Sequence, residues 1–68
     1  MKYKYYKTKY KRLNPVDIFV YLGGLDMYCP IGQHGQLSLE YLKDCKEITK
    51  KVYLKISERL YTPKEYID

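Results

Sequence analysis

Between residues 16 and 31, apolar and polar side chains alternate in the two-residue period of β-strands, and a Gly23-Gly24 dipeptide interrupts the alternation. Two glycines suit the positive φ angles of a two-residue hairpin turn, so the pattern predicts strands at 16–22 and 25–31. The turn sets the register, which pairs Leu22 with Leu25 and continues outward. One face of this hairpin is entirely apolar and is expected to be buried; it consists of Val16, Ile18, Val20, Leu22, Leu25, Met27, Cys29 and Ile31.

The opposite face of the predicted hairpin is aromatic and acidic, with Phe19 opposite Tyr28 and with Tyr21, Asp17 and Asp26 beside them. Three interpretations are open for this face. Its rings could stack on single-stranded bases, although the two acids would repel phosphate. They could also lie against another protomer, or form cross-strand pairs that stabilise an exposed sheet.

The residues at the end of the hairpin predict which strand forms an edge of the sheet. Pro30 has no N–H to donate to a further strand, so the strand at 25–31 is expected at an edge of the sheet. The polar segment 32–36 that follows is expected to be a loop.

Lysine and tyrosine alternate from Tyr3 to Tyr10, which predicts a third strand at 3–10 beside 16–22, because Asn14-Pro15 marks a turn between the two. The alternation changes parity at Tyr5-Tyr6, and a β-bulge there would restore a single aromatic face. A frayed terminus is the alternative interpretation.

In the C-terminal half, three hydroxyl residues each follow an apolar residue and precede another by four positions, the pattern of a helix N-cap with a hydrophobic staple. The capping residues are Ser38, Thr49 and Thr62, and the predicted helices are 39–46, 50–61 and 63–67. The third signal is the most complete, because Pro63 follows the cap and Glu65 completes a capping box.

Apolar residues recur every fourth position in the second predicted helix, at Val52, Ile56 and Leu60, and this stripe, joined by Tyr53, is expected to face the core. The stripe continues backwards through Ile48 and Cys45, so a single helix over 39–61 is the alternative.

These elements predict one small α+β domain over residues 1–68. We expect a three-stranded antiparallel meander (3–10, 16–22 and 25–31) with two or three helices packed on one face. A chain of 68 residues buries only about 60% of its unfolded surface, so its stability is expected to be marginal.

The charge of the chain is unevenly distributed. The first twelve residues hold six basic side chains, four tyrosines and no acid, whereas the other fifty-six hold seven basic and eight acidic side chains. The basic residues of this arm are Lys2, Lys4, Lys7, Lys9, Lys11 and Arg12. A basic segment interleaved with aromatic rings attracts polyanions.

Candidate catalytic and metal-binding residues are few. Cys29, His34 and Cys45 are three ligand types for zinc, but a structural site commonly has four, in close Cys-x-x-Cys pairs. A Cys–His nucleophile would need a substrate pocket that so small a chain has little room for. We therefore expect no metal, no cofactor, no small-molecule substrate and no enzyme activity.

The chain is expected to be cytoplasmic. The sequence shows no secretory signal, its two cysteines are too few for a disulfide framework, and no stretch approaches the roughly 18 apolar residues that span a bilayer. The absence of Ala beside abundant Lys and Tyr suggests an AT-rich bacterial, phage or mobile-element gene.

The leading expectation for function is a small binding or regulatory module that recognises a protein partner, or itself, through a tyrosine-rich surface. The alternative is nucleic-acid binding through the basic arm and the aromatic sheet face, and attraction to an anionic membrane is a weaker option. Besides the six basic residues, the candidate contacts are Tyr3, Tyr5, Tyr6, Tyr10, Phe19, Tyr21 and Tyr28. A basic row at Lys51, Lys55 and Arg59 could extend the arm, but such rows are more often solvated helix faces.

Overall fold

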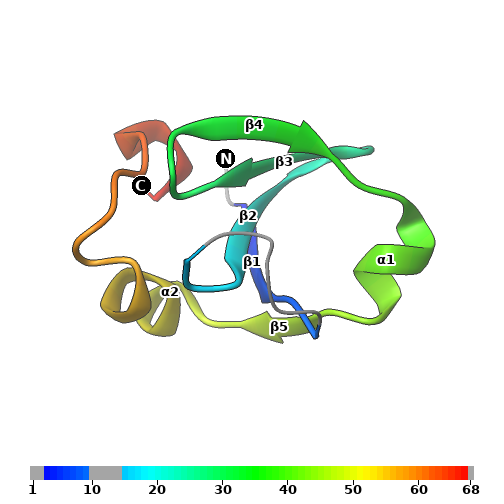
Figure 1. Cartoon of the computed structure of the whole chain (residues 1–68), viewed down its shortest axis with the longest axis horizontal. Helices are drawn as coiled ribbons and strands as arrows, with labels where there is room; N and C mark the ends of the chain where they lie inside the picture. Colours follow the sequence, from blue (N-terminus) through cyan, green and yellow to red (C-terminus); the bar gives the residue numbers. More distant parts are fainter. Residues whose placement is uncertain (1–2, 10–14, 68) are drawn as a thin grey trace.

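The computed structural model describes residues 3–9 and 15–67. Its centre is a five-stranded antiparallel sheet in the order β4-β3-β2-β1-β5 (Figure 1). The strands are β1 (Lys4–Lys7), β2 (Ile18–Gly23), β3 (Asp26–Cys29), β4 (Gln33–Gln36) and β5 (Lys46–Ile48). Two short helices, α1 (Leu39–Lys43) and α2 (Lys50–Ile56), and a 3₁₀ turn, η1 (Lys64–Tyr66), complete the α+β fold.

The predicted meander forms the middle of this sheet, because β1, β2 and β3 lie side by side in chain order. The strand count is wrong, since β4 and β5 add one strand at each edge. β4 comes from the segment expected to be a loop, and it covers the edge that Pro30 was expected to leave open. Gly32, with a φ of 85°, closes the tight turn between β3 and β4. The sequence pattern missed β4 because Gln33–Gln36 has no apolar alternation.

The hairpin register differs from the prediction by one residue. Val20 lies opposite Tyr28 and Tyr21 opposite Met27, with an irregularity between Tyr21 and Gly23. The turn therefore falls on Gly24-Leu25, and Leu22 is the extra residue, because Gly23, with a φ of 102°, lies opposite Asp26. A slip of one residue moves the side chains of β3 to the opposite face relative to β2, so residues that were predicted to pack together lie in different clusters.

Both faces of the sheet are buried, which the single apolar face of the prediction did not anticipate. The first cluster contains Tyr5, Ile18, Val20, Tyr28 and Tyr53, packed by α2 and the C-terminal segment. The second contains Phe19, Met27, Cys29 and Leu37, packed by Tyr41 and Leu42 of α1 and by Cys45 after it. The helices thus cover opposite faces rather than one.

Two members of the predicted buried face lie in solvent. Leu25, in the shifted turn, is 51% exposed, and Ile31, in the turn before β4, is 43% exposed. The register slip also moves Met27 and Cys29 to the face of Phe19.

β1 is regular, so the predicted bulge at Tyr5-Tyr6 is wrong. Tyr5 lies opposite Val20 and Tyr6 opposite Phe19 in an unbroken register. The two rings therefore point to opposite faces, and each finds a cluster to pack against because both faces are covered.

Two of the three predicted helix caps are confirmed. The Ser38 hydroxyl accepts the Tyr41 N–H and the Thr49 hydroxyl accepts the Val52 N–H, both at 3.1 Å. The helices that follow are shorter than predicted, and β5 between them excludes one continuous helix. In α2 the buried residue is Tyr53, whereas Val52 of the predicted stripe is 41% exposed.

The third cap is wrong, because the 3₁₀ turn η1 begins after Pro63 without a side-chain cap. The Thr62 hydroxyl instead shares a 2.9 Å hydrogen bond with the Tyr53 hydroxyl. Thr62 therefore ties the C-terminal segment to α2 rather than starting a helix.

Three buried tyrosines hold the C-terminal segment 61–67 against the first cluster. The Tyr5 hydroxyl donates to the Tyr66 carbonyl oxygen at 2.7 Å, and the Tyr28 hydroxyl donates to the Tyr61 carbonyl oxygen at 2.8 Å. The third bond is the one between Tyr53 and Thr62. In Figure 1 the segment runs from α2 past the end of the sheet to η1, beside β4.

Replacing Thr62 with Ala should lower the free energy of unfolding by about 1–3 kcal/mol, because the buried Tyr53 hydroxyl loses its partner. Thr62→Ser keeps a hydroxyl and should retain most of the stability. Urea denaturation of the three proteins measures the difference. Equal losses in both variants would show that the Thr62 methyl, and not the hydroxyl, is responsible.

Burial also changes the acid–base properties of these tyrosines. It raises the pKa of Tyr53 from 10.0 to about 12, since the low-dielectric core disfavours the phenolate, and the hydrogen bond with Thr62 only partly opposes this. Burial raises the pKa of Tyr5 and Tyr28 in the same direction. In the unfolded chain these phenols would ionise at a lower pH than in the folded protein.

Because the folded pKa of Tyr53 is raised, its stabilising contribution is complete below pH 10 and is lost as the pH rises through about 12. Thermal melts across this range should show the melting temperature falling with pH. Tyr53→Phe should be less stable at neutral pH but lose less stability across the alkaline range. An identical alkaline loss in the variant would contradict the role assigned to this phenol.

Candidate functional site

The candidate contacts on β1 are only partly available at the surface. Lys4 and Lys7 are exposed, and so is Lys9 just after the strand. The remaining candidates of the arm, Lys2, Tyr10, Lys11 and Arg12, lie outside the described residues.

The aromatic candidates mostly lie inside the protein. Phe19 and Tyr28 have at most 1% of their surface exposed and Tyr5 has 6%, so none of them can contact a partner while the sheet is intact. This corrects the expectation of an open aromatic sheet face, and the cause is that the helices cover both faces. The half-buried candidates are Tyr3, Tyr6 and Tyr21.

The half-buried rings are engaged with other rings. Tyr3 packs edge-on against Tyr66, with ring centroids 5.3 Å apart. Tyr6 stacks on Phe19 at 5.8 Å. Among the described tyrosines only Tyr61, which was not a candidate, is exposed, at 68%. The tyrosines of this protein therefore act mainly as core residues.

β5 places a further lysine beside β1. Its register with β1 pairs Lys46 directly with Lys7, and both side chains are exposed. Cross-strand partners have Cβ atoms about 4.5–5.5 Å apart, where like charges destabilise the pairing. The side chains of Lys7 and Lys46 thus start from adjacent backbone positions near one edge of the sheet.

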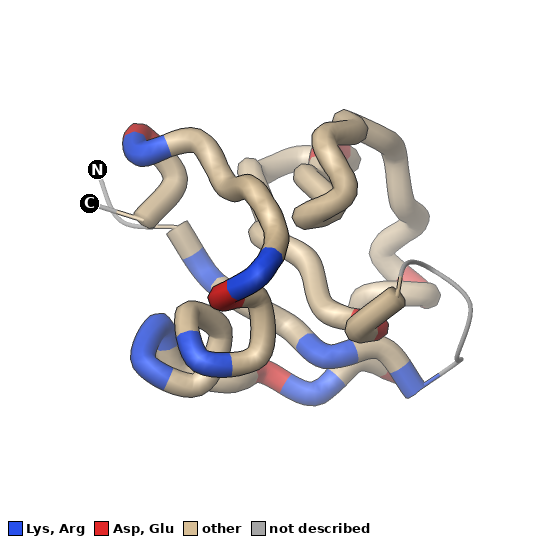
Figure 2. The backbone as a smooth tube through the Cα atoms, turned by 60° about the vertical axis from the view of Figure 1, so that its left-hand side comes forward, with Lys and Arg blue, Asp and Glu red and all other residues tan. Residues whose placement is uncertain are grey.

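α2 adds three more exposed lysines directly after β5. We call the combined set the basic surface; it consists of Lys4, Lys7, Lys9, Lys46, Lys50, Lys51 and Lys55. Figure 2 shows the blue positions gathering on β1, β5 and α2 in the lower part of the view. Glu47 of β5 is the one acid among the described residues of these three elements. The predicted row at Lys51 and Lys55 belongs to this surface, whereas Arg59 lies beyond the end of α2.

The segment 15–44 has the opposite net charge. Residues 15–44 contain four acids, Asp17, Asp26, Glu40 and Asp44, and one basic residue, Lys43. Asp26 and Glu40, on β3 and α1, lie on other elements than the basic surface. Asp17 lies beside that surface, because its carbonyl oxygen accepts the N–H of Thr8, between Lys7 and Lys9. Basic side chains outnumber acidic ones on β1, β5 and α2, which favours the approach of an anionic partner.

Lys46 and Lys50 were not among the candidates predicted from the sequence. Lys46 was assigned to a helix at 39–46, and Lys50 to the start of the helix at 50–61. A signal was present in the spacing of the caps. Ser38 and Thr49 both need extended backbone, and α1 must end before Thr49. This leaves room for a short extended segment between the two helices, although nothing in the sequence showed that it would pair with β1.

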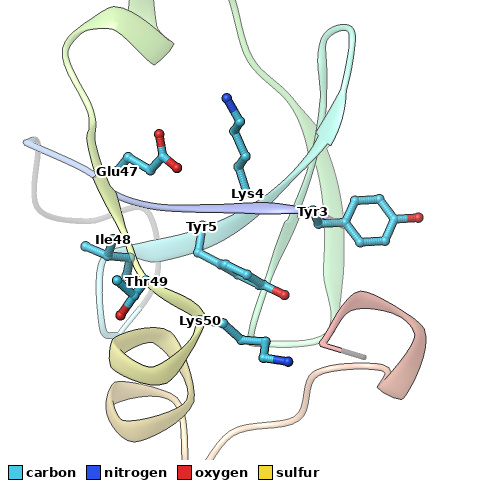
Figure 3. Close-up of a pocket in the computed structure, with 7 residues that line it drawn as sticks. All are labelled: Tyr3, Lys4, Tyr5, Glu47, Ile48, Thr49 and Lys50. Atoms are coloured by element: carbon cyan, nitrogen blue, oxygen red, sulfur yellow. The ribbon is translucent and has the colours of Figure 1, made fainter. Parts of the chain in front are cut away.

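A surface pocket of about 340 Å³ opens where β5 turns away from β1 into α2. Its lining residues are Tyr3, Lys4, Tyr5, Glu47, Ile48, Thr49 and Lys50. Figure 3 shows Lys4 and Glu47 extending to one side of β1, and Tyr5 and Lys50 to the other. The pocket is thus a cleft at the sheet edge with lysines on both sides and a carboxylate on one.

The cysteines and the histidine are not brought together. Cys29 and Cys45 belong to the second cluster, while the His34 ring packs against Tyr28 of the first, with centroids 5.1 Å apart. The Cys45 thiol donates to the Tyr41 carbonyl oxygen at 3.3 Å, and burial raises its pKa, which favours the unreactive thiol. Within residues 3–9 and 15–67, no cluster of three His, Cys, Asp or Glu side chains is placed to hold a metal ion.

The helices of the described part of the chain are all too short and too polar to cross a membrane.

Comparisons of the chain with models of protein families, with curated proteins and with solved structures find no match.

Proposed function

We propose that the protein is a small non-catalytic binding module that holds the phosphate backbone of a nucleic acid on its basic surface. The observation that carries the proposal is the pairing of Lys7 with Lys46 across β1 and β5. Such a pairing of like charges is unfavourable in the free protein, and a phosphate between the two ammonium groups would relieve it.

The other lysines of the basic surface support the same partner. They lie on both sides of the sheet edge, on β1 and on α2, so an extended chain of phosphates could contact several of them at once. Lysine acts as a point charge towards phosphate, which positions the ligand without reading its bases. We therefore expect binding with little sequence preference and a steep dependence on salt.

The burial of the aromatic candidates is what favours nucleic acid over a protein partner. A tyrosine-rich recognition surface needs exposed rings, and Tyr5, Phe19 and Tyr28 are inside. A protein partner of this kind would have to use other residues, with Tyr61 as the exposed ring. An accessory role in the cytoplasm of a bacterium, as expected from the sequence, is part of the proposal.

The double variant Lys7→Gln/Lys46→Gln should bind DNA and RNA oligonucleotides more weakly and with a flatter salt dependence. For every phosphate that the variant no longer neutralises, the slope of log K against log salt should decrease by roughly 0.7 for single strands and 0.9 for duplexes. Fluorescence anisotropy with a mixed-sequence oligonucleotide across a salt series measures both effects.

A matched control removes the same charge elsewhere. Lys43→Gln/Lys64→Gln changes two exposed lysines, one on α1 and one in η1, that are outside the basic surface. It should keep the slope of the unmodified protein. Equal weakening in both double variants would mean that binding depends only on the net charge of the protein. If the unmodified protein binds no oligonucleotide at low salt, nucleic acid is rejected as the ligand and a protein partner is favoured instead.

A further inference from the structure

The two edges of the sheet differ in charge and length. β5, at one edge, has three residues, of which two are charged, and it lies within the basic surface. β4, at the other edge, has four residues and none that is formally charged at neutral pH. Figure 1 shows β4 along the upper border of the sheet, and within the described residues no further strand pairs with β4 on its outer side. Just before β4, Ile31 forms an isolated bridge with Tyr61 of the C-terminal segment.

Edge strands expose unpaired backbone groups, and proteins usually protect them with charge, proline, short length or a covering segment. β5 has two of these devices, because it is short and carries Lys46 and Glu47. In β4 the side chains of Gln33, His34 and Gln36 are exposed, and nothing in the strand opposes the approach of another strand.

The backbone groups that face outward from β4 follow from its pairing with β3. The Leu37 N–H donates to the Leu25 carbonyl oxygen at 2.8 Å, in register with the β3–β4 pairs. Antiparallel pairs alternate between hydrogen-bonded and non-hydrogen-bonded, so Gly35 and Gln33 direct their backbone groups at β3. The N–H and C=O groups of His34 and Gln36 therefore point to the outer edge.

Gly35, between these two residues, has no role in the single chain that requires glycine. Its φ is not in the positive range, and a Cβ there would meet the Met27 Cε at 3.6 Å, an ordinary contact. Glycine inside a strand costs stability and often marks a place where another backbone comes close. The close approach of a second backbone from outside the single chain is thus the more direct explanation for a glycine at position 35.

We propose that β4 is an interface for a second copy of this chain, which adds its own β4 in antiparallel orientation. A twofold axis at Gly35 would place His34 of each copy opposite Gln36 of the other. The outward N–H and C=O groups of these residues then form backbone hydrogen bonds across the axis, and the two glycines face each other in the closest pair, with Cα atoms about 4.5 Å apart.

A second copy fits this edge better than an unrelated strand for two reasons. The segment is complementary to itself, because an uncharged strand paired about a twofold axis sets no like charges against each other. The basic surface lies at the opposite edge, so pairing through β4 keeps the two positive regions apart on the outer sides of one continuous sheet. This dimer does not depend on whether nucleic acid is the ligand.

The experiment combines sedimentation with amide exchange on the unmodified protein from micromolar to millimolar concentration. The apparent mass should rise towards twice that of the single chain. Over the same range, the His34 and Gln36 amides should become protected, while the Gly35 amide is protected throughout. A mass that stays monomeric, or a dimer in which the His34 and Gln36 amides still exchange rapidly, would overturn the proposal.

Charge variants test the register directly. His34→Lys/Gln36→Lys and His34→Glu/Gln36→Glu should each remain monomeric, because like charges then face each other across the axis. An equal mixture of the two should form a heterodimer. Val52→Lys/Leu54→Lys adds the same positive charge at exposed positions on α2 and should dimerise like the unmodified protein.

Circular dichroism melting checks that each charge variant is folded, since His34 also shares a 2.8 Å hydrogen bond with the Tyr66 hydroxyl. Folded variants that still dimerise separately, or a mixture that does not associate, would reject β4 as the interface.

Discussion

Hydrogen bonds from buried phenol hydroxyls to the C-terminal segment hold the first core of this protein closed. A short sheet with aromatic residues on both faces has more apolar surface than a five-residue and a seven-residue helix can cover. Residues 61–67 complete the cover, with Tyr66 and Ile67 packed against the first cluster. The hydroxyls of Tyr5, Tyr28 and Tyr53 therefore hold this segment over the first cluster, through two backbone carbonyl oxygens and the Thr62 hydroxyl. In a larger domain a longer helix would cover such a cluster.

The burial of the tyrosines also determines which side chains remain available at the surface. A ring buried with a satisfied hydroxyl is not available for recognition, so the abundance of tyrosine indicates a small core rather than a binding surface. What remains at the surface is mostly charge. The β1–β5 pairing then decides the distribution of that charge, because it brings lysines that are almost forty residues apart in the chain into one register.

The sheet is consequently asymmetric from edge to edge. β5 forms one edge with Lys46 and Glu47, whose charges oppose the addition of a strand, and β4 forms the other edge with residues that carry no formal charge. The lysines around β5 favour an anionic ligand at that edge, whereas the neutral edge at β4, with outward backbone groups, favours another strand. The two proposed interactions can therefore occur at the same time on opposite sides of one small domain.

The sequence by itself determined the local elements that depend on neighbouring residues. The hairpin strands, the N-caps at Ser38 and Thr49, the α+β class and the basic arm could all be predicted, because turn glycines, cap hydroxyls and charge act over a few positions. Only the tertiary structure decided the register, the two extra strands and the true surroundings of the aromatic residues. A bulge at Leu22 costs little locally yet exchanges the faces of a whole strand, and β4 and β5 are strands only because neighbouring strands offer them backbone partners. The cap expected at Thr62 does not form for the same reason, since the buried Tyr53 hydroxyl competes for that oxygen from a distant part of the fold.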